Sequence, residues 1–328
     1  MSTAFTLRGP AWVAVRQHRR ALWAGLGLLV LAAGYLLWVR LSAGDAAATL
    51  QATGCQVETE NQDCLGDIQN YLDAEVPFEF AITRIGLVMA VLPSLLAAFV
   101  AGPLIARELE SGTYKLMWSQ SVSPARWLAA KLAVPGALAL TGIGLFSVLY
   151  YWAWSTGPGE FGTRHWYEVP VSASALPVPL AYGVFGIAVG ALTGLLVGRT
   201  VPALATGALA VGTVSVVMWS YIQPWLWPVE TAENVETVEN ALVGSASVVD
   251  NGLLTRTGEH LPFSVCRSSS NEEQLEQCKA AHDVIGTWAE YHPSSHFLPL
   301  QLVHSGILLV LAAAAAFAAF RVLKRRHA

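Results

Sequence analysis

The residues of this 328-residue chain that could bind a metal ion are its histidines, five of which lie between positions 260 and 304. His292 and His296 have the i,i+4 spacing of two ligands on one helical turn. Pro293 lies between them, however, and no acidic residue is placed to complete a ligand set. The pattern therefore predicts no metal site.

The sequence also lacks the motifs of common catalytic centres. It contains neither H-E-x-x-H nor G-x-S-x-G, and the phosphate-binding pattern G-x-x-x-x-G-K-[ST] does not occur. We therefore predict that this chain has no catalytic residue and binds no cofactor itself.

The composition of the chain indicates that its main elements are membrane-spanning helices. Hydrophobic residues make up 54% of the chain and charged residues 13%, against roughly 25% charged in a soluble domain. The apolar residues form long blocks, so we predict an all-α integral membrane protein with six transmembrane helices, because backbone groups in lipid must be paired within helices. The predicted spans are 21–39, 86–105, 132–154, 175–197, 201–222 and 300–320.

Two further segments have the pattern of membrane-surface helices. Residues 1–20 place Trp12 and Val13 beside several arginines, which predicts an amphipathic interfacial helix. Val284–Phe297 is rich in aromatic residues but too short to span, so we predict an interfacial or re-entrant helix. A signal peptide cleaved near residues 46–48 is the alternative for the first span, but the apolar block is long for a signal core.

Charge predicts which side of the membrane each connection faces. With the N-terminus inside, the inner segments hold 13 of the 19 basic residues and two of the 23 acidic residues, Glu108 and Glu110. Inner segments of membrane proteins are enriched in Lys and Arg, so both termini are predicted to be cytoplasmic. The acidic connections 40–80 and 223–299 would then be extracellular. The inner segments are 1–20, 106–131, 198–200 and 321–328.

All four cysteines fall in the outer segments of this topology. An oxidising compartment favours disulfides, and four cysteines allow three pairings. We favour the local pairs, Cys55 with Cys64 and Cys266 with Cys278. A zinc site is the alternative, and the long spacings argue against it.

The span centres contain no Asp, Glu, Lys or His. Charged groups at membrane depth mark proton and ion paths, so this composition argues against a proton-coupled pump or a cation channel. The Ser, Thr and aromatic side chains present instead suit an amphipathic or apolar substrate.

Glycines recur at every fourth position of the fourth span. Gly186, Gly190, Gly194 and Gly198 form three consecutive G-x-x-x-G steps, which place small residues along one helix face. This face predicts close helix packing within the chain, and a subunit interface is the alternative.

Residues 103–131, PLIARELESGTYKLMWSQSVSPARWLAAK, form the one substantial inner connection. The second span continues into a charged helical end that Gly112 can terminate, and Thr113 can cap a following helix. Ser123-Pro124 is a helix start, because serine caps and proline suits the first turn. The pattern predicts a helix–turn–helix at the inner surface.

This connection resembles the "ARE-x-E-x-GT…W-T/S-Q-S-V" segment of permease subunits of ATP-binding-cassette exporters. The resemblance is to the class whose two membrane halves each carry six helices (type V exporter-like), of which actinobacterial drug and antibiotic exporters are typical. The segment His292-Pro293…Phe297…Gln301 is similar to the one that leads into the final helix of that family. The resemblance covers nearly the whole chain and is weakest over residues 223–290.

The resemblance implies a multi-pass permease of the bacterial cell membrane that exports a drug, antibiotic, peptide or lipid. A second permease subunit, identical or related, and two cytosolic ATPase subunits would complete the complex, with ATP and Mg bound by the ATPase. Glu108 and Glu110 would face basic groups on the ATPase. The motif positions that would couple the two subunits are Arg107, Glu108, Glu110, Gly112 and Thr113.

The implied organisation is an interfacial helix over 1–20 and a six-span permease domain over 21–328, with 106–131 as the coupling loop and 223–299 as the large outer loop. A membrane sensor or immunity complex is the alternative function, since it would bind an extracellular ligand without net transport. The residues expected to line a substrate path are Met89, Ser94, Phe99, Thr213 and Met218.

Overall fold

The chain forms two compact units. The first is a helical bundle formed by the described residues of 1–164, 168–217 and 304–328. The second consists of the described residues of 165–167 and 218–303. The computed structural model describes residues 19–57, 62–114, 123–157, 165–233, 246–267 and 271–327.

Long helices dominate the bundle. A π-helical turn, Ala97–Ala101, joins α3 to α4, so these two helices form one continuous helical segment. The helices are α2 (Arg19–Thr53), α3 (Leu65–Leu96), α4 (Gly102–Ser111), α6 (Pro124–Ser155), α7 (Val169–Ser172), α8 (Val178–Val197), α9 (Thr200–Val217) and α12 (Phe297–His327), the last of which begins in the second unit. Among the described residues, 6 helical stretches are long and apolar enough to cross a membrane, which confirms the predicted number of spans.

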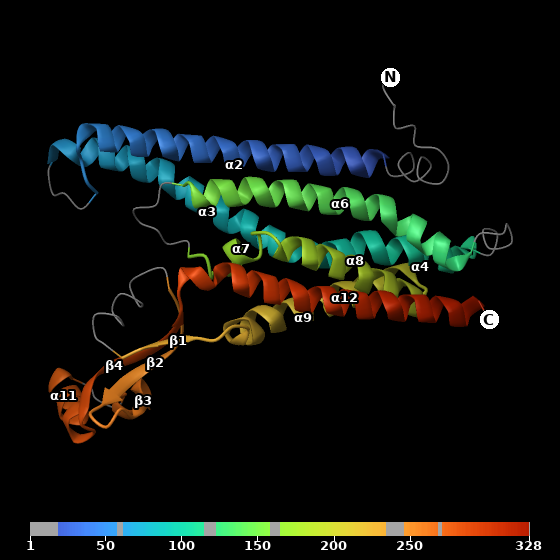
Figure 1. Ribbon diagram of the computed structural model, residues 1–328. Coiled ribbons are helices and arrows are strands. Elements are labelled where there is room, and N and C mark those ends of the chain that lie inside the picture. The colour runs from blue at the N-terminus through green and yellow to red at the C-terminus, as the bar shows by residue number, and fades with distance from the viewer. Residues whose placement is uncertain are drawn as a thin grey trace. The chain divides into compact units, whose positions relative to one another are not determined.

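The first two spans are longer than the sequence predicts. The connection 40–80, expected to be a loop, is helical over most of its length because α2 continues to Thr53 and α3 begins at Leu65. α2 and α3 lie side by side and extend beyond the end of α6 (Figure 1). These extensions contain many Ala residues, which favour helix, but their polar residues interrupt the apolar runs from which the spans were predicted.

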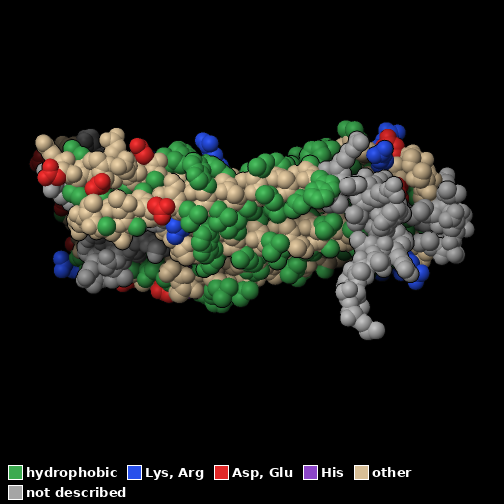
Figure 2. Space-filling model, turned by 90° about the horizontal axis from the view of Figure 1, so that it is seen from above, with side chains coloured by type: hydrophobic (Ala, Val, Ile, Leu, Met, Phe, Trp, Pro, Cys, Tyr) green, Lys and Arg blue, Asp and Glu red, His purple; other side chains and the backbone are tan. Residues whose placement is uncertain are grey.

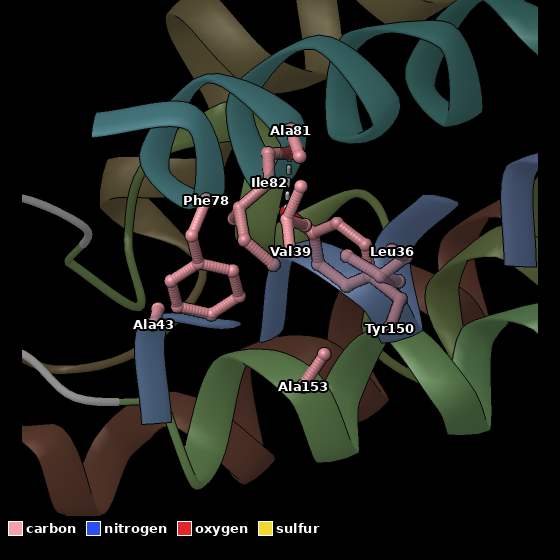
Figure 3. Close-up of a cluster of buried hydrophobic side chains, with 8 residues drawn as sticks. All are labelled: Leu36, Val39, Ala43, Phe78, Ala81, Ile82, Tyr150 and Ala153. Atoms are coloured by element: carbon pink, nitrogen blue, oxygen red, sulfur yellow. Dashed lines mark hydrogen bonds between the residues drawn. The ribbon is translucent and has the colours of Figure 1, made fainter. Parts of the chain in front are cut away.

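A buried apolar cluster joins α2, α3 and α6 (Figure 3). Tyr150 of α6 is fully buried, and its hydroxyl donates to the carbonyl oxygens of Ile82 at 3.0 Å and Pro170 at 3.1 Å. These bonds satisfy the one polar atom that the tyrosine ring brings into this apolar core. The residues of the cluster are Leu36, Val39, Ala43, Phe78, Ala81, Ile82, Tyr150 and Ala153.

The outer surface of the helices fits a lipid environment. On the face shown in Figure 2, hydrophobic side chains cover the long middle part, and charged side chains gather toward the ends. Large apolar side chains such as Leu28, Val88 and Leu145 are exposed on these helices. An apolar band of this kind indicates a membrane-embedded protein.

The second unit contains a four-stranded antiparallel sheet, which the all-α prediction did not include. The strands are β1 (Glu230–Ala232), β2 (Ser247–Thr255), β3 (His260–Pro262) and β4 (Val284–His292), in the order β1-β4-β2-β3, and helix α11 (Glu272–Ala281) precedes β4. The interfacial or re-entrant helix predicted for 284–297 is therefore wrong. The β-branched and aromatic residues of β4 favour a strand, and β4 pairs on both sides.

Both local cysteine pairs are bonded in the structure. Cys55 joins Cys64 between α2 and α3, and Cys266 joins Cys278 of α11. These are the pairings that the sequence analysis favours. The predicted interfacial helix over 1–20 falls almost entirely outside the described residues, which begin at Arg19.

Candidate functional site

The segment Arg107–Thr113 lies at the end of the bundle where α2 begins and α12 ends, here called the terminal end (Figure 1). α4 stops at Gly112, whose φ of 72° is in the left-handed region that favours glycine. The Gly112 N–H donates to the Leu109 carbonyl at 3.3 Å. The predicted helix end is therefore confirmed.

The predicted start of the next span is confirmed as well. α6 begins at Pro124, and the Ser123 hydroxyl accepts a bond from the Arg126 N–H at 3.4 Å. The Thr113 hydroxyl lies 3.0 Å from that of Ser111. The helix that Thr113 was expected to cap falls in residues 115–122, outside the described residues.

Glu108 joins α4 to α6. Its Oε2 accepts a bond from the Trp127 indole N–H at 2.9 Å, and its Oε1 pairs with the Lys131 ammonium. Trp127 is buried, so this bond satisfies an indole donor that water does not reach. A single carboxylate thereby holds two residues one turn apart on the neighbouring helix.

Glu110 joins α4 to α9. Its Oε2 accepts bonds from the Thr200 backbone N–H at 2.9 Å and the Thr200 hydroxyl at 2.7 Å. Thr200 is the first residue of α9, so the carboxylate lies against the positive end of that helix and satisfies a backbone donor that lacks an intrahelical partner. The two residues are 90 positions apart in the sequence.

An apolar cluster lies beside these polar contacts. It brings together side chains from α4, α6, α8 and α12, and Leu109 and Tyr114 pack against it. Because closely packed interiors transmit displacement, movement of the α4 end would also displace the neighbouring helices. The buried members are Ile105, Trp127, Leu128, Ala191, Leu195, Ala319 and Leu323.

These contacts give the two carboxylates partners within the chain. The sequence analysis placed Glu108 and Glu110 against basic groups of another protein, but in the structure both are bonded within the chain. Arg107 and Thr113 remain exposed at the same end. No sequence signal pairs Glu110 with Thr200, or Glu108 with Trp127 and Lys131.

The residues expected to line a substrate path differ in their exposure. Phe99 and Thr213 are exposed, and the Ser94 hydroxyl lies close to Gly212 of α9. Met89 is buried with Ile143 and Phe146 in a cluster inside the bundle, and Met218 is also buried. Both methionine side chains are therefore covered by packing within the chain.

The glycine face of α8 packs within the chain. A Cβ at Gly186 would lie 2.5 Å from the Pro93 carbonyl oxygen, and one at Gly194 would lie 2.7 Å from that of Gly102. Gly190 is equally close to Ala97 of the π-helical turn. Gly198 does not belong to this contact, since it ends α8 with a φ of 64°.

Two histidines form a polar cluster in the second unit. The Nδ1 atoms of His292 and His296 lie 3.1 Å apart, and His296 Nε2 lies 3.4 Å from a Glu230 carboxylate oxygen. Burial and the charge of Glu230 raise the pKa of the neighbouring Tyr291. Among the described residues, no group of three His, Cys, Asp or Glu side chains is arranged to hold a metal ion.

A buried histidine lies inside the bundle. The His304 Nε2 of α12 lies 3.0 Å from the Tyr182 hydroxyl of α8, and both side chains are buried. His304 occupies the first part of the predicted sixth span, so the spans are not entirely free of ionisable side chains. The pair joins two helices by a hydrogen bond shielded from lipid.

The family model described as "ABC-2 membrane transporter related" matches residues 26–223, which include five of the six predicted spans apart from a few residues at one end. No curated protein and no solved structure matches the chain.

Proposed function

Because the chain belongs to the ABC-2 membrane transporter related family, we propose that it is the transmembrane subunit of an ATP-binding-cassette exporter. The sequence has no phosphate-binding loop, so a separate ATPase subunit would bind and hydrolyse ATP. The observation that supports a coupling role at the terminal end is the pair of carboxylates on α4, which bond to two different membrane helices.

The proposed mechanism is mechanical. An ATPase docked at the terminal end pushes on the chain around Gly112, where exposed Arg107 and Thr113 are available for contact. α4 moves, and Glu108 and Glu110 carry that movement to α6 and α9. Two permease subunits, identical or related, then open a path between them. Coupling of this kind requires an element with two arrangements that the ATPase biases.

Substrate chemistry follows from the helix surfaces. The π-helical turn Ala97–Ala101 carries Phe99 and α9 carries Leu209 and Val216, all of which are exposed and apolar. A path lined by such side chains suits an amphipathic or apolar substrate. A sensor or immunity complex that binds its ligand without transport would use the same coupling contacts, so transport must be measured directly.

We propose that the terminal end is cytoplasmic. The described basic residues of this end include Arg126, Arg199 and Arg321, and the inner segments hold 13 of the 19 basic residues. The Cys55–Cys64 disulfide lies at the far end of α2 and α3, which suits an oxidising extracellular compartment.

The test is to reconstitute the chain with its ATPase and replace Thr200 by Val and Glu110 by Gln. We expect both variants to assemble, but ATP hydrolysis stimulated by the permease and substrate uptake into sealed vesicles should fall by about tenfold. Glu276→Gln in α11 is the matched control for loss of an exposed carboxylate. Unchanged stimulation in both variants would refute the coupling role, and stimulation without uptake would favour the sensor.

A further inference from the structure

The α2–α3 hairpin, defined here as residues 41–83, extends well past the membrane-spanning length of the bundle. α8 has 20 residues and is therefore about 30 Å long, the thickness of a hydrocarbon core. α8 runs in the same direction as α3, and its Gly186 lies beside Pro93. α8 starts 8 residues before Gly186 (186 − 178), so its first residue lies level with position 85 of α3 (93 − 8). The 20 residues from Leu65 to Arg84 therefore extend about 30 Å beyond α8.

Covalent and packing contacts hold the two helices of the hairpin together. Cys55 and Cys64 cross-link its tip, and Leu50, Ile68 and Tyr71 form a small core just below. At its base, Phe78 and Ala43 belong to the cluster shared with α6 (Figure 3). Arg40 bonds to the backbone carbonyl of Thr156 after α6, which holds the base in place. The surface it presents is therefore preformed.

An apolar stripe runs along the free face of the hairpin. Leu65, Leu72, Val76 and Phe80 of α3 are each between 36% and 56% exposed in the whole chain. At about 100° per residue they lie within about 80° of one another, so they form one face. Most of this stripe is beyond the level at which lipid would cover it, and such contiguous exposed apolar surface marks an interaction site.

Charge narrows the choice of partner. Residues 41–83 contain eight acidic residues and no Lys or Arg, and Asp73 and Glu79 flank the stripe on α3. The same face of a second copy would bring like charges together, which disfavours self-association through it. A small cation would make no apolar contact with the stripe. The acidic residues of the hairpin would repel an anionic amphiphile. The remaining chemistry is a cation with an apolar face.

We infer that the α2–α3 hairpin binds a cationic amphipathic peptide, which lays its apolar face on Leu72, Val76 and Phe80 and its basic side chains against the flanking carboxylates. An amphipathic helix that binds an apolar surface through its own apolar face is a recurring recognition mode, and complementary charge adds to its specificity. The inference rests on the proposed function only in making such a peptide the substrate or ligand of the exporter; binding itself needs no ATPase.

The experiment uses the full chain in nanodiscs of phosphatidylcholine, without ATPase. The probe is a fluorescent amphipathic helix of about 14 Leu and Lys residues, and its comparison peptide has Glu in place of Lys. We expect the Lys peptide to bind more tightly than to empty nanodiscs, the Glu peptide not to bind, and the Kd to rise by about tenfold or more in the L72S/V76S variant. Salt should weaken binding, because Asp73 is exposed and its charge is screened by ions.

Two controls separate loss of the binding surface from other effects of substitution. Ile285→Ser removes an apolar side chain of β4 that is 54% exposed and should leave the Kd unchanged. Mass spectrometry of the intact Cys55–Cys64 disulfide shows that L72S/V76S has kept its hairpin. Equal binding of both peptides, or a wild-type Kd in L72S/V76S, would overturn the inference. Loss of ATPase coupling in the Thr200→Val and Glu110→Gln variants would leave this binding intact, so the two proposals fail separately.

Discussion

Glu108 and Glu110 are two positions apart on one short helix, yet they bond to different neighbours. Glu108 turns toward Trp127 and Lys131 of α6, and Glu110 turns toward Thr200 of α9. Both carboxylates accept more than one bond, and charged acceptors make the stronger hydrogen bonds. At the scale of single residues, the terminal end is therefore a junction of three helices.

Trp127→Phe tests one arm of this junction. Phenylalanine keeps an aromatic ring in the buried site but removes the N–H that donates to Glu108. We expect the free energy of unfolding to fall by about 1 kcal/mol, the ordinary value of a buried hydrogen bond, and ATPase stimulation to fall with it. Thermal unfolding of the purified chain measures the first effect.

The control for this variant is Trp38→Phe. Trp38 is 65% exposed on α2, whereas Trp127 is 1% exposed. The control should leave both stability and stimulation at wild-type values. A Trp127→Phe protein as stable and as active as the control would mean that the indole bond contributes nothing.

At the scale of elements, packing of α8 against α3 and α4 depends on missing side chains. Gly190→Ala would place a Cβ 2.8 Å from the Ala97 carbonyl oxygen and from the Ala101 Cβ, closer than real contacts allow. Backbone and helix would have to shift, which costs about 1–3 kcal/mol. We expect a lower melting temperature for Gly190→Ala. Gly142→Ala on α6 is the matched control, since no atom lies within 4 Å of its Cβ position, and an equal loss in both variants would contradict this account.

Local signals made some elements predictable from the sequence. Gly112 and Ser123-Pro124 mark helix ends through their own backbone preferences, and the six spans follow from hydropathy alone. The partnership of Glu110 with Thr200 depends on contacts between segments 90 residues apart, so no local pattern could reveal it. The helical hairpin was missed because hydropathy detects membrane helices and not their polar extensions.

The sheet was missed for a different reason. β4 contains Val284, Ile285, Thr287, Trp288 and Tyr291, a composition that favours strands. Its aromatic residues and its place before a span suggested a membrane-surface helix instead. Strand composition alone does not identify a strand, because a strand also needs partners to pair with. β2 is that partner and pairs with β4 over nearly its whole length.

At the scale of the whole molecule, the proposal requires that the basic terminal end face the cytoplasm, where ATP is. The lysines of the chain allow a direct test. Lys115, Lys131 and Lys324 lie in the segments proposed to be inside, and Lys279 of α11 lies in the segment proposed to be outside.

An amine reagent that cannot cross membranes should therefore modify Lys279 on intact cells, and mass spectrometry should find the other three lysines unmodified. In inside-out vesicles the pattern should reverse, with strong modification of Lys324 and weaker modification of Lys131, whose ammonium is paired with Glu108. Lys279→Arg should abolish labelling of intact cells, which shows that the signal comes from this residue. Because an ATPase in the cytoplasm can only push on the side it reaches, modification of Lys324 from outside would place α4 out of its reach and end the coupling model.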